Sequence, residues 1–292
     1  MPASTELNAK IAVLGLGTMG SRIANRLCEC GYQVIGWNRT PDKQFPKLTI
    51  VSTIPEAVNL ADIIMISVTD SIAVEEIVTQ FPSKSSNQTT IIMDMSTIGP
   101  ESARSIAFSM EEPYIYLDSP VLGTTTEANE GTLKVLLGGT PDDATFVISV
   151  LGDSLGEIIH VGGIGSGSAA KLVANFSLLA AVVSFGEAYS MGAALGLESS
   201  TLQGIISTGP LGSQVDRRIP AILDGRFEKR FSLDLALKDT SLIVKQPQLL
   251  DKELYITKGI QDWLSLAVDS GNGQLDYTAV LATILGTLAR PD

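Results

Sequence analysis

The sequence is poor in the side chains that most often bind metals or form nucleophile–base pairs. It has one histidine, His160, and two cysteines, Cys28 and Cys30, among 292 residues. A single histidine nearly excludes histidine-based triads and His-rich metal sites, and His160 is expected to end a strand. The cysteines are two apart, too close for an ordinary disulfide and without the C-x-x-C spacing of redox and zinc sites. We therefore expect no metal site and two reduced cysteines.

Positive charge is also scarce. The sequence has 20 lysines and arginines and 32 aspartates and glutamates, which gives a net charge of −12. This excess of negative charge repels nucleic acid and anionic membranes. The opening M-P-A-S-T-E-L-N-A-K has neither the basic nor the apolar region of a secretion signal. We expect a cytoplasmic, compact protein with no nucleic-acid or membrane partner, in which a local positive site binds any anionic ligand.

A glycine-rich turn between a strand and a helix is the first motif that carries chemistry. Residues 10–14 predict a strand, G-L-G-T-M-G follows, and 21–30 predict a helix. In this context Gly15 permits a tight turn, Gly17 lets a pyrophosphate approach the backbone and Gly20 lets helix and strand pack closely. The alternative is a turn that is merely rich in glycine. The residues predicted to bind a dinucleotide here are Gly15, Leu16, Gly17, Thr18, Met19 and Gly20.

The end of the second predicted strand, 33–37, indicates which dinucleotide is bound. An NAD site would place an acidic residue about 20 positions beyond the glycines, to bind the ribose 2′-hydroxyl. The sequence has Asn38, Arg39 and Thr40 there instead. Arg39 can pair with a 2′-phosphate and stack on adenine, while Asn38 and Thr40 donate hydrogen bonds to the same phosphate. We predict NADP(H), against the alternative that Arg39 is an ordinary surface charge.

Strands and helices alternate through the first half of the chain. This order predicts an α/β fold, a Rossmann-type doubly wound parallel sheet over residues 1–164. The further strands are expected at 61–68, 90–94, 114–117, 133–137 and 157–161, and the helices between them at 72–81, 101–110 and 141–151.

Polar residues follow two of these strands at the carboxyl ends, where such sheets bind ligands. We predict that Val68, Thr69, Asp70 and Thr97 contact the cofactor, although the same residue types also cap helices. Residues 118–131 are expected to be a long polar loop whose small residues offer backbone N–H groups to a carboxylate.

The stretch from Gly165 to Leu197 predicts one long helix that leads into the second half. Lys171 and Asn175 are four apart, so they project from one helical face and can form a catalytic pair. The alternative is a solvated lysine near a helix end and an asparagine bonded to its own chain. A membrane span is the other rival, but the apolar run 172–186 is interrupted by Asn175 and falls short of the roughly 18–20 residues required.

The remaining sequence predicts helices only, and hence an all-α domain over residues 165–292. Its high apolar fraction predicts a homodimer that buries shared surface. Phe231, Lys238 and Asp239 are placed near a helix start and could close over a site, or the two charges could be exposed turn residues. The helices are expected at 200–206, 214–223, 233–245, 254–269 and 277–288.

Taken together, these motifs resemble the β-hydroxyacid dehydrogenase family, which includes 3-hydroxyisobutyrate dehydrogenases and glyoxylate/succinic semialdehyde reductases. The resemblance covers nearly the whole chain. It rests on G-L-G-T-M-G, the segment from Asp118 to Leu133, G-S-G-S-A-A-K-L-V-A-N, and the late Phe231 and Lys238-Asp239. W-N-R-T at 37–40 is similar to the NADPH-using branch in particular.

The resemblance implies a role for each matched residue. Lys171 would be the catalytic acid and Asn175 would orient the substrate. The substrate would be bound by Thr97 and by Leu122, Gly123 and Thr124. Phe231 and Asp239 would enclose it, and Lys238 would reach cofactor or substrate. The chain departs from the family at Leu122-Gly123-Thr124, where the usual pattern is Ser-Gly-Gly. The missing serine hydroxyl counts against glyoxylate or a simple hydroxy acid as the best substrate.

The predicted function is NADPH-dependent hydride transfer to the carbonyl of a small aldehyde or keto acid of the semialdehyde or glyoxylate type, giving a hydroxy acid. Two alternatives stay open. Imine reductases share a similar NADPH segment and prefer apolar substrate loops, which Leu122 favours, but they generally lack the pair formed by Lys171 and Asn175. The other is an NADP-binding protein without turnover.

Overall fold

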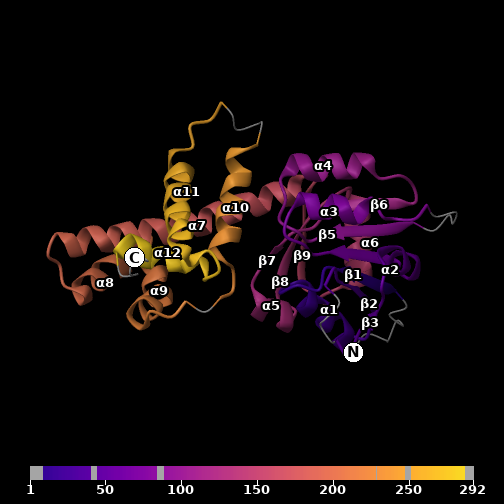
Figure 1. The fold of residues 1–292 in the computed structure, drawn as a ribbon, viewed down its shortest axis with the longest axis horizontal. Coiled ribbons are helices and arrows are strands. Elements are labelled where there is room, and N and C mark those ends of the chain that lie inside the picture. The colour runs from indigo at the N-terminus through magenta and orange to yellow at the C-terminus, as the bar shows by residue number, and fades with distance from the viewer. Residues whose placement is uncertain (1–8, 41–44, 84–88, 228, 247–250, 287–292) are drawn as a thin grey trace. The chain divides into compact units, whose positions relative to one another are not determined.

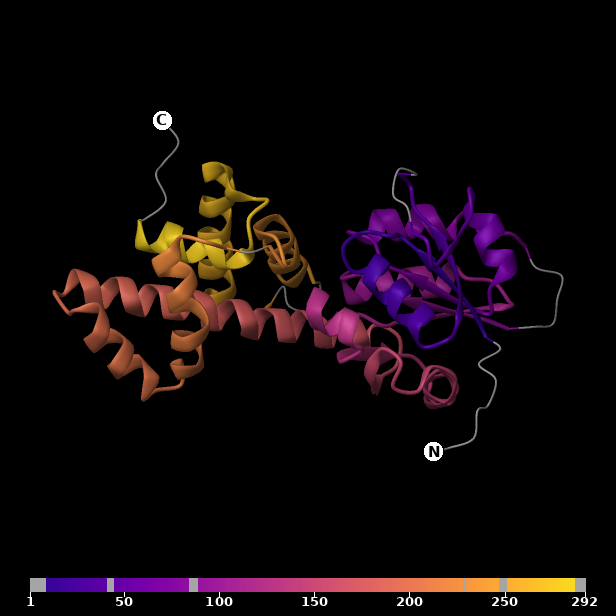
Figure 2. The same ribbon diagram turned by 90° about the horizontal axis from the view of Figure 1, so that it is seen from below.

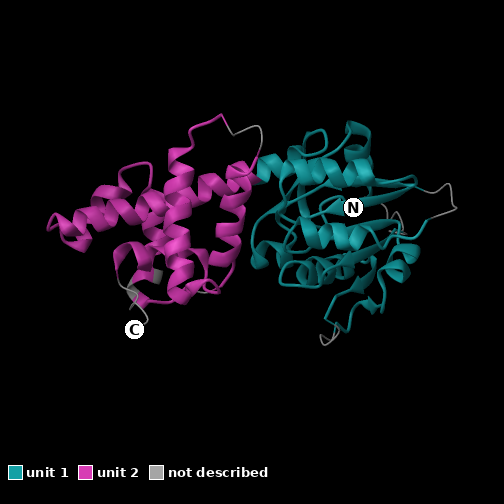
Figure 3. Cartoon of the chain, turned by 45° about the horizontal axis from the view of Figure 1, so that its top comes forward, with its two compact units in different colours: residues 1–171 teal, residues 172–292 magenta. Residues whose placement is uncertain are grey.

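The computed structural model divides the chain into two compact units, residues 1–171 and 172–292 (Figure 3). The division falls inside the long helix α7 (Ser166–Ala194), after Lys171. The sequence instead suggests a boundary at 164/165, where this helix begins. The residues whose structure is described are 9–40, 45–83, 89–227, 229–246 and 251–286.

Unit 1 is built on a nine-stranded sheet in the order β3-β2-β1-β4-β5-β6-β8-β7, with β9 beside β8 (Figure 1). Each neighbouring pair from β3 to β6 in this order is parallel, whereas β8 is antiparallel to both β6 and β7. The predicted doubly wound, mainly parallel sheet is confirmed. Its antiparallel pairs lie toward one edge. The strands are β1 (Lys10–Leu14), β2 (Gln33–Trp37), β3 (Thr49–Ile50), β4 (Ile63–Ile66), β5 (Thr90–Asp94), β6 (Tyr114–Asp118), β7 (Val121–Leu122), β8 (Leu133–Gly138) and β9 (Gly156–Gly162).

Helices cover both faces of this sheet, so its central strands are mostly apolar, with polar residues only at their ends. Along β1, Ile11 and Val13 belong to one core cluster, together with residues of α1 and α6, and Ala12 and Leu14 belong to a second, together with residues of α2, α3 and α4. The alternation follows from the two-residue period of a strand. The helices of unit 1 are α1 (Gly20–Glu29), α2 (Ile54–Leu60), α3 (Ser71–Val78), α4 (Pro100–Ser109), α5 (Thr125–Glu130) and α6 (Pro141–Leu151).

The prediction of a loop over 118–131 is wrong. The segment forms the short strand β7 and then helix α5. Thr124 and Glu127 form a capping box at the start of α5, and Gly131 ends it with a left-handed φ of 71°. Elements of two and six residues are too short for a periodic pattern to reveal them, which also explains why β3 and α2 are absent from the predicted order.

In the described residues of unit 2, helices are the only regular elements, apart from a single bridge between Ser232 and Asp276. Its core includes Leu179 and Phe185 of α7, which Figures 1 and 2 show as an unbroken helix. The expected helix 277–288 is a 3₁₀ turn followed by α12, and residues 287–288 lie outside the described residues. The remaining elements are α8 (Ser199–Ser207), α9 (Gly212–Asp224), α10 (Leu233–Val244), α11 (Tyr255–Ala267), η2 (Val268–Asn272), η3 (Tyr277–Ala279) and α12 (Val280–Leu285).

Helix α7 is long and apolar enough to cross a membrane by length and composition, and no other helix in the described part of the chain is. Core helices of globular proteins meet the same criterion. In unit 2, α7 contributes Leu179, Val182 and Phe185 to the helical core, and the polar Asn175 of the same helix is also buried.

Two buried aspartates end the neighbouring strands β5 and β6, where Asp94 and Asp118 are register partners. The Asp94 carboxylate accepts hydrogen bonds from the Tyr116 hydroxyl at 2.6 Å and the Ser96 N–H at 2.9 Å. Loss of solvent nevertheless raises the pKa of Asp94 to about 6, because burial outweighs these bonds and the nearby Asp118 adds repulsion.

This raised pKa predicts how stability depends on pH. Folded Asp94 binds its proton more tightly than the unfolded chain does, so the free energy of unfolding should fall as pH rises from about 4 to about 6 and then level off. The difference in pKa corresponds to about 3 kcal/mol. Asp94→Asn, which keeps the shape of the side chain, should remove this part of the slope in denaturant titrations between about pH 4 and pH 8.

The matched control is Asp142→Asn, because Asp142 is exposed and its substitution should leave the slope as it is. An unchanged slope in Asp94→Asn would contradict the assignment of the slope to Asp94.

Candidate active site

The glycine turn after β1 has the shape that a dinucleotide pyrophosphate requires. Gly15 has a φ of 101°, and a Cβ there would overlap the Ser67 carbonyl oxygen. A Cβ on Gly20 would overlap the Gly15 carbonyl oxygen, so only glycine lets α1 approach β1 this closely. A Cβ on Gly17 would meet nothing within 4 Å, which leaves space above the turn. The cradle fits a phosphate group at the positive end of α1.

Asn38 ties this turn to the end of β2. Its side-chain oxygen accepts the Leu16 N–H at 3.0 Å, and its amide donates to the Thr40 carbonyl at 2.8 Å. Asn38 thus bonds to the protein backbone on both sides, a positioning role that sequence reasoning missed. Arg39 and Thr40 are exposed directly beyond it.

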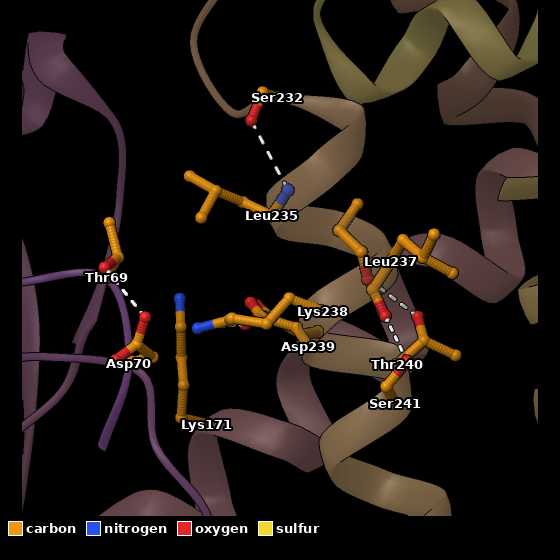
Figure 4. Close-up of polar contacts among 12 residues, drawn as sticks. Thr69, Asp70, Lys171, Ser232, Leu235, Leu237, Lys238, Asp239, Thr240 and Ser241 are labelled. Carbon is orange, nitrogen blue, oxygen red and sulfur yellow. Dashed lines mark hydrogen bonds and ion pairs between the residues drawn. The ribbon is translucent and has the colours of Figure 1, made fainter. Parts of the chain in front are cut away.

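The sheet brings the other predicted cofactor residues to the same edge, because β1, β4 and β5 are neighbours and parallel. The Val68 N–H donates to the Ser96 hydroxyl at 3.0 Å, which links the turns after β4 and β5. Asp70 caps α3 by accepting the Ala73 N–H at 2.9 Å, and it also accepts the Thr69 hydroxyl (Figure 4). The capping alternative therefore holds for Asp70. Thr97 follows Ser96 and is half-buried.

The predicted substrate residues lie in β7 and at the start of α5. Leu122 is half-buried and pairs with Lys134 of β8. Gly123 has a φ of 133°, a conformation that favours glycine. The Thr124 hydroxyl and N–H both donate to Glu127 at 2.6 Å, so Thr124 serves as a helix cap in this structure.

Lys171 lies in the second turn of α7 and is half-buried. Its ammonium nitrogen donates to the Val121 carbonyl oxygen at 2.8 Å. Because Val121 directly precedes Leu122 and Gly123, this bond brings the lysine to the predicted substrate residues of unit 1.

In unit 2, a chain of polar contacts runs from Asn175 into α10. The Asn175 amide donates to Asp239 at 2.6 Å, and the other oxygen of Asp239 pairs with Lys238 at 2.9 Å. Both Lys238 and Asp239 lie inside α10, which Ser232 caps (Figure 4), not at its start. Asp239 is 1% exposed, so it is not an exposed turn charge. Phe231 packs its ring on Tyr277, with centroids 5.6 Å apart.

Three polar residues at or just after the ends of β5 and β6 support the turns of the site, a role that sequence reasoning gave to none of them. The Asp94 carboxylate accepts the Ser96 N–H, and the Ser96 hydroxyl accepts the Val68 N–H. The Asp118 carboxylate accepts two N–H groups at the start of α7. Their signal in the sequence is a polar residue at or just after the end of an apolar strand, but that pattern does not say which N–H groups the side chain will meet.

Two family models match the chain. The model of the NAD binding domain of 6-phosphogluconate dehydrogenase matches residues 10–163. A second model, described as NAD-binding of NADP-dependent 3-hydroxyisobutyrate dehydrogenase, matches residues 165–284. The two matches together cover almost all of the chain.

Individual proteins give the same result. The 2-(hydroxymethyl)glutarate dehydrogenase of Eubacterium barkeri is 30% identical, over 94% of this chain and 95% of its own. The solved 3-hydroxyisobutyrate dehydrogenase of Mycobacterium tuberculosis with L-serine is 26% identical, with a TM-score of 0.84 over 95% of this chain and 99% of its own. An imine reductase from Pseudomonas sp. is 19% identical, with a TM-score of 0.61 over 95% and 99%, which shows a shared fold only. The chain belongs to the β-hydroxyacid dehydrogenase family and is an NAD(P)-dependent oxidoreductase.

Proposed function

We propose that the protein uses NADPH to reduce the carbonyl of a small aldehyde or keto acid of the semialdehyde or glyoxylate type, giving a hydroxy acid. The observation that carries the proposal is the bond from Lys171 to the Val121 carbonyl, which keeps an ammonium group beside Leu122 and Gly123. The 2-(hydroxymethyl)glutarate dehydrogenase and the 3-hydroxyisobutyrate dehydrogenase support it, because both are named for compounds that contain a hydroxymethyl group and a carboxylate.

In this proposal a bound NADPH supplies the hydride, and Lys171 donates the proton that the carbonyl oxygen needs. Asn175 orients the substrate, and its bond to Asp239 fixes the direction of its amide. Thr97 and Gly123 hold the substrate, while Phe231 and Asp239 line its pocket and Lys238 reaches cofactor or substrate. Proton transfer from a positioned side chain contributes about 10² to 10⁴ in rate.

The proposal predicts that Lys171→Ala lowers kcat by about 10² to 10⁴ and changes the Kd of NADPH by less than about threefold, because only the proton donor is lost. NADPH oxidation should be followed with succinic semialdehyde, with glyoxylate and with a cyclic imine. The exposed Lys47 provides the matched control, since Lys47→Ala removes a lysine that pairs with the exposed Glu29.

The substrate panel also separates the alternatives. Turnover of the cyclic imine without turnover of any carbonyl would favour an imine reductase, which Leu122 and the W-N-R-T segment support. Binding of NADPH with no oxidation by any compound would favour a binding protein. Undiminished kcat in Lys171→Ala would contradict the role given to Lys171.

Preference for NADPH over NADH is proposed from Arg39, which is exposed at the end of β2 beside the glycine turn. Arg39→Ala should raise the Kd of NADPH about tenfold to a hundredfold and that of NADH much less, because both cofactors lose the stacking on adenine but only NADPH carries a 2′-phosphate. Fluorescence titration of both cofactors measures the difference. Arg226→Ala, at an exposed arginine of unit 2, is the control. An equal loss for both cofactors would rule out the assignment.

Leu122 is proposed to set the substrate preference, since it stands where the family usually has a serine. Leu122→Ser should lower the KM of glyoxylate about tenfold, because a hydroxyl can bind the carboxylate that a leucine cannot. Leu122→Ala is the matched control, because it opens the same space without adding a donor. If both variants lower the KM equally, the effect comes from space and not from the hydroxyl.

We also propose a cytoplasmic homodimer. Both cysteines are free thiols, as in reducing compartments. The second copy is proposed to cover apolar side chains that unit 2 leaves exposed on α7 and α8, among them Met191, at 62% exposure, and Ile205, at 57%.

A further inference from the structure

Helix α7 begins without a capping side chain of its own. It is preceded by Gly165, which has a φ of 89° and no side chain, and its first turn contains no acidic residue. The first N–H groups of any helix have no partner within that helix, so they must be satisfied from elsewhere.

The carboxylate of Asp118, which ends β6, supplies that partner from 47 residues before Gly165. One oxygen accepts the Gly165 N–H at 2.8 Å, and the other accepts the Ser168 N–H at 2.7 Å. These positions are the N-cap and third residue of the helix, the two donors that a capping box normally satisfies with local side chains. Asp118 is 1% exposed, and a carboxylate is favoured at the positive end of a helix.

Two glycines make this contact possible. A Cβ on Gly167 would overlap the carbonyl oxygens of Leu136 and Asp118, and a Cβ on Gly138 would overlap the Asp118 carboxylate. The start of α7 therefore sits directly on β6 and β8. Of the G-S-G-S segment, Gly167 serves this close packing.

The segment 118–121 makes a second contact with α7, through Lys171. Asp118 and Val121 are three residues apart, and so are Ser168 and Lys171. Asp118 binds the N–H of Ser168, and the Val121 carbonyl binds the ammonium of Lys171. Because a helix rises 1.5 Å per residue, the lysine lies about 4.5 Å along the axis from Ser168. A helix start that loosens or slides must therefore move the ammonium group.

We propose that Asp118 is a positioning residue for the reaction, which fixes the first turn of α7 and thereby the place of the Lys171 ammonium beside Leu122. This inference rests on the proposed function of Lys171 as proton donor. Asp118 needs no contact with substrate or cofactor for this role, since it acts through the helix.

The test compares Asp118→Asn, Lys171→Ala and the double variant in the full-length protein. Asp118→Asn should lower kcat at least about tenfold while the Kd of NADPH changes less than about twofold. In the Lys171→Ala background, the same change at 118 should lower kcat no further, because its effect passes through Lys171. Amide hydrogen exchange of a peptide covering 162–171 should be faster in Asp118→Asn.

The control for a general loss of stability is Thr53→Ala. Thr53 caps α2 of the same unit by accepting the Glu56 N–H at 3.3 Å, and α2 packs on β1 and β2. This variant should lower the melting temperature but leave kcat and the exchange of 162–171 as in the parent protein. If Asp118→Asn does not fold, Asp118→Ser is the second variant, since its smaller side chain leaves room for water at the two N–H groups.

The outcomes distinguish the two proposals. If Lys171→Ala keeps its kcat, the proposed proton donor is wrong and the positioning role fails with it. If Lys171→Ala loses its rate but Asp118→Asn keeps the parent kcat, only the positioning role is overturned. The same holds if the change at 118 lowers kcat by an equal factor in both backgrounds, because that is the mark of a purely structural contribution.

Discussion

The bond between the Lys171 ammonium and the Val121 carbonyl is the contact on which the proposed chemistry depends. An ammonium group that is taken partly out of water needs an acceptor, and a backbone carbonyl satisfies it without neutralising its charge. The 2.8 Å bond holds the lysine next to Leu122 and Gly123. Without this bond the lysine side chain would move freely, and its ammonium group would have no fixed position relative to a substrate.

The glycines of the chain serve two distinct purposes that a sequence motif alone does not separate. Gly15 and Gly20 let α1 meet β1, and the space above Gly17 is open for a pyrophosphate. Gly167 and Gly138 instead let α7 lie against the sheet, and the space beside them is filled by Asp118. The glycines before α1 thus leave space for a ligand, whereas Gly167 and Gly138 let the protein's own carboxylate, Asp118, reach the start of α7.

Much of the fold could be predicted because its main signals are local. Strands 10–14 and 90–94 contain continuous apolar runs, at 11–14 and 91–93, and a strand, glycine turn and helix in sequence specify a dinucleotide-type unit. The short β7 escaped prediction because two residues show no period. The capping of α7 by Asp118 escaped for a different reason: its partners are 47 and 50 residues away, and only the register of β6 and β8 brings them together.

The central claim, that Lys171 gives its proton to the substrate oxygen, is tested most directly by a crystal structure with NADPH and an unreactive carbonyl analogue. The account predicts that the Lys171 ammonium lies within about 2.6–3.2 Å of the analogue's oxygen, the distance that proton transfer requires. A structure in which another side chain meets that oxygen, with Lys171 remaining on Val121 alone, would contradict it.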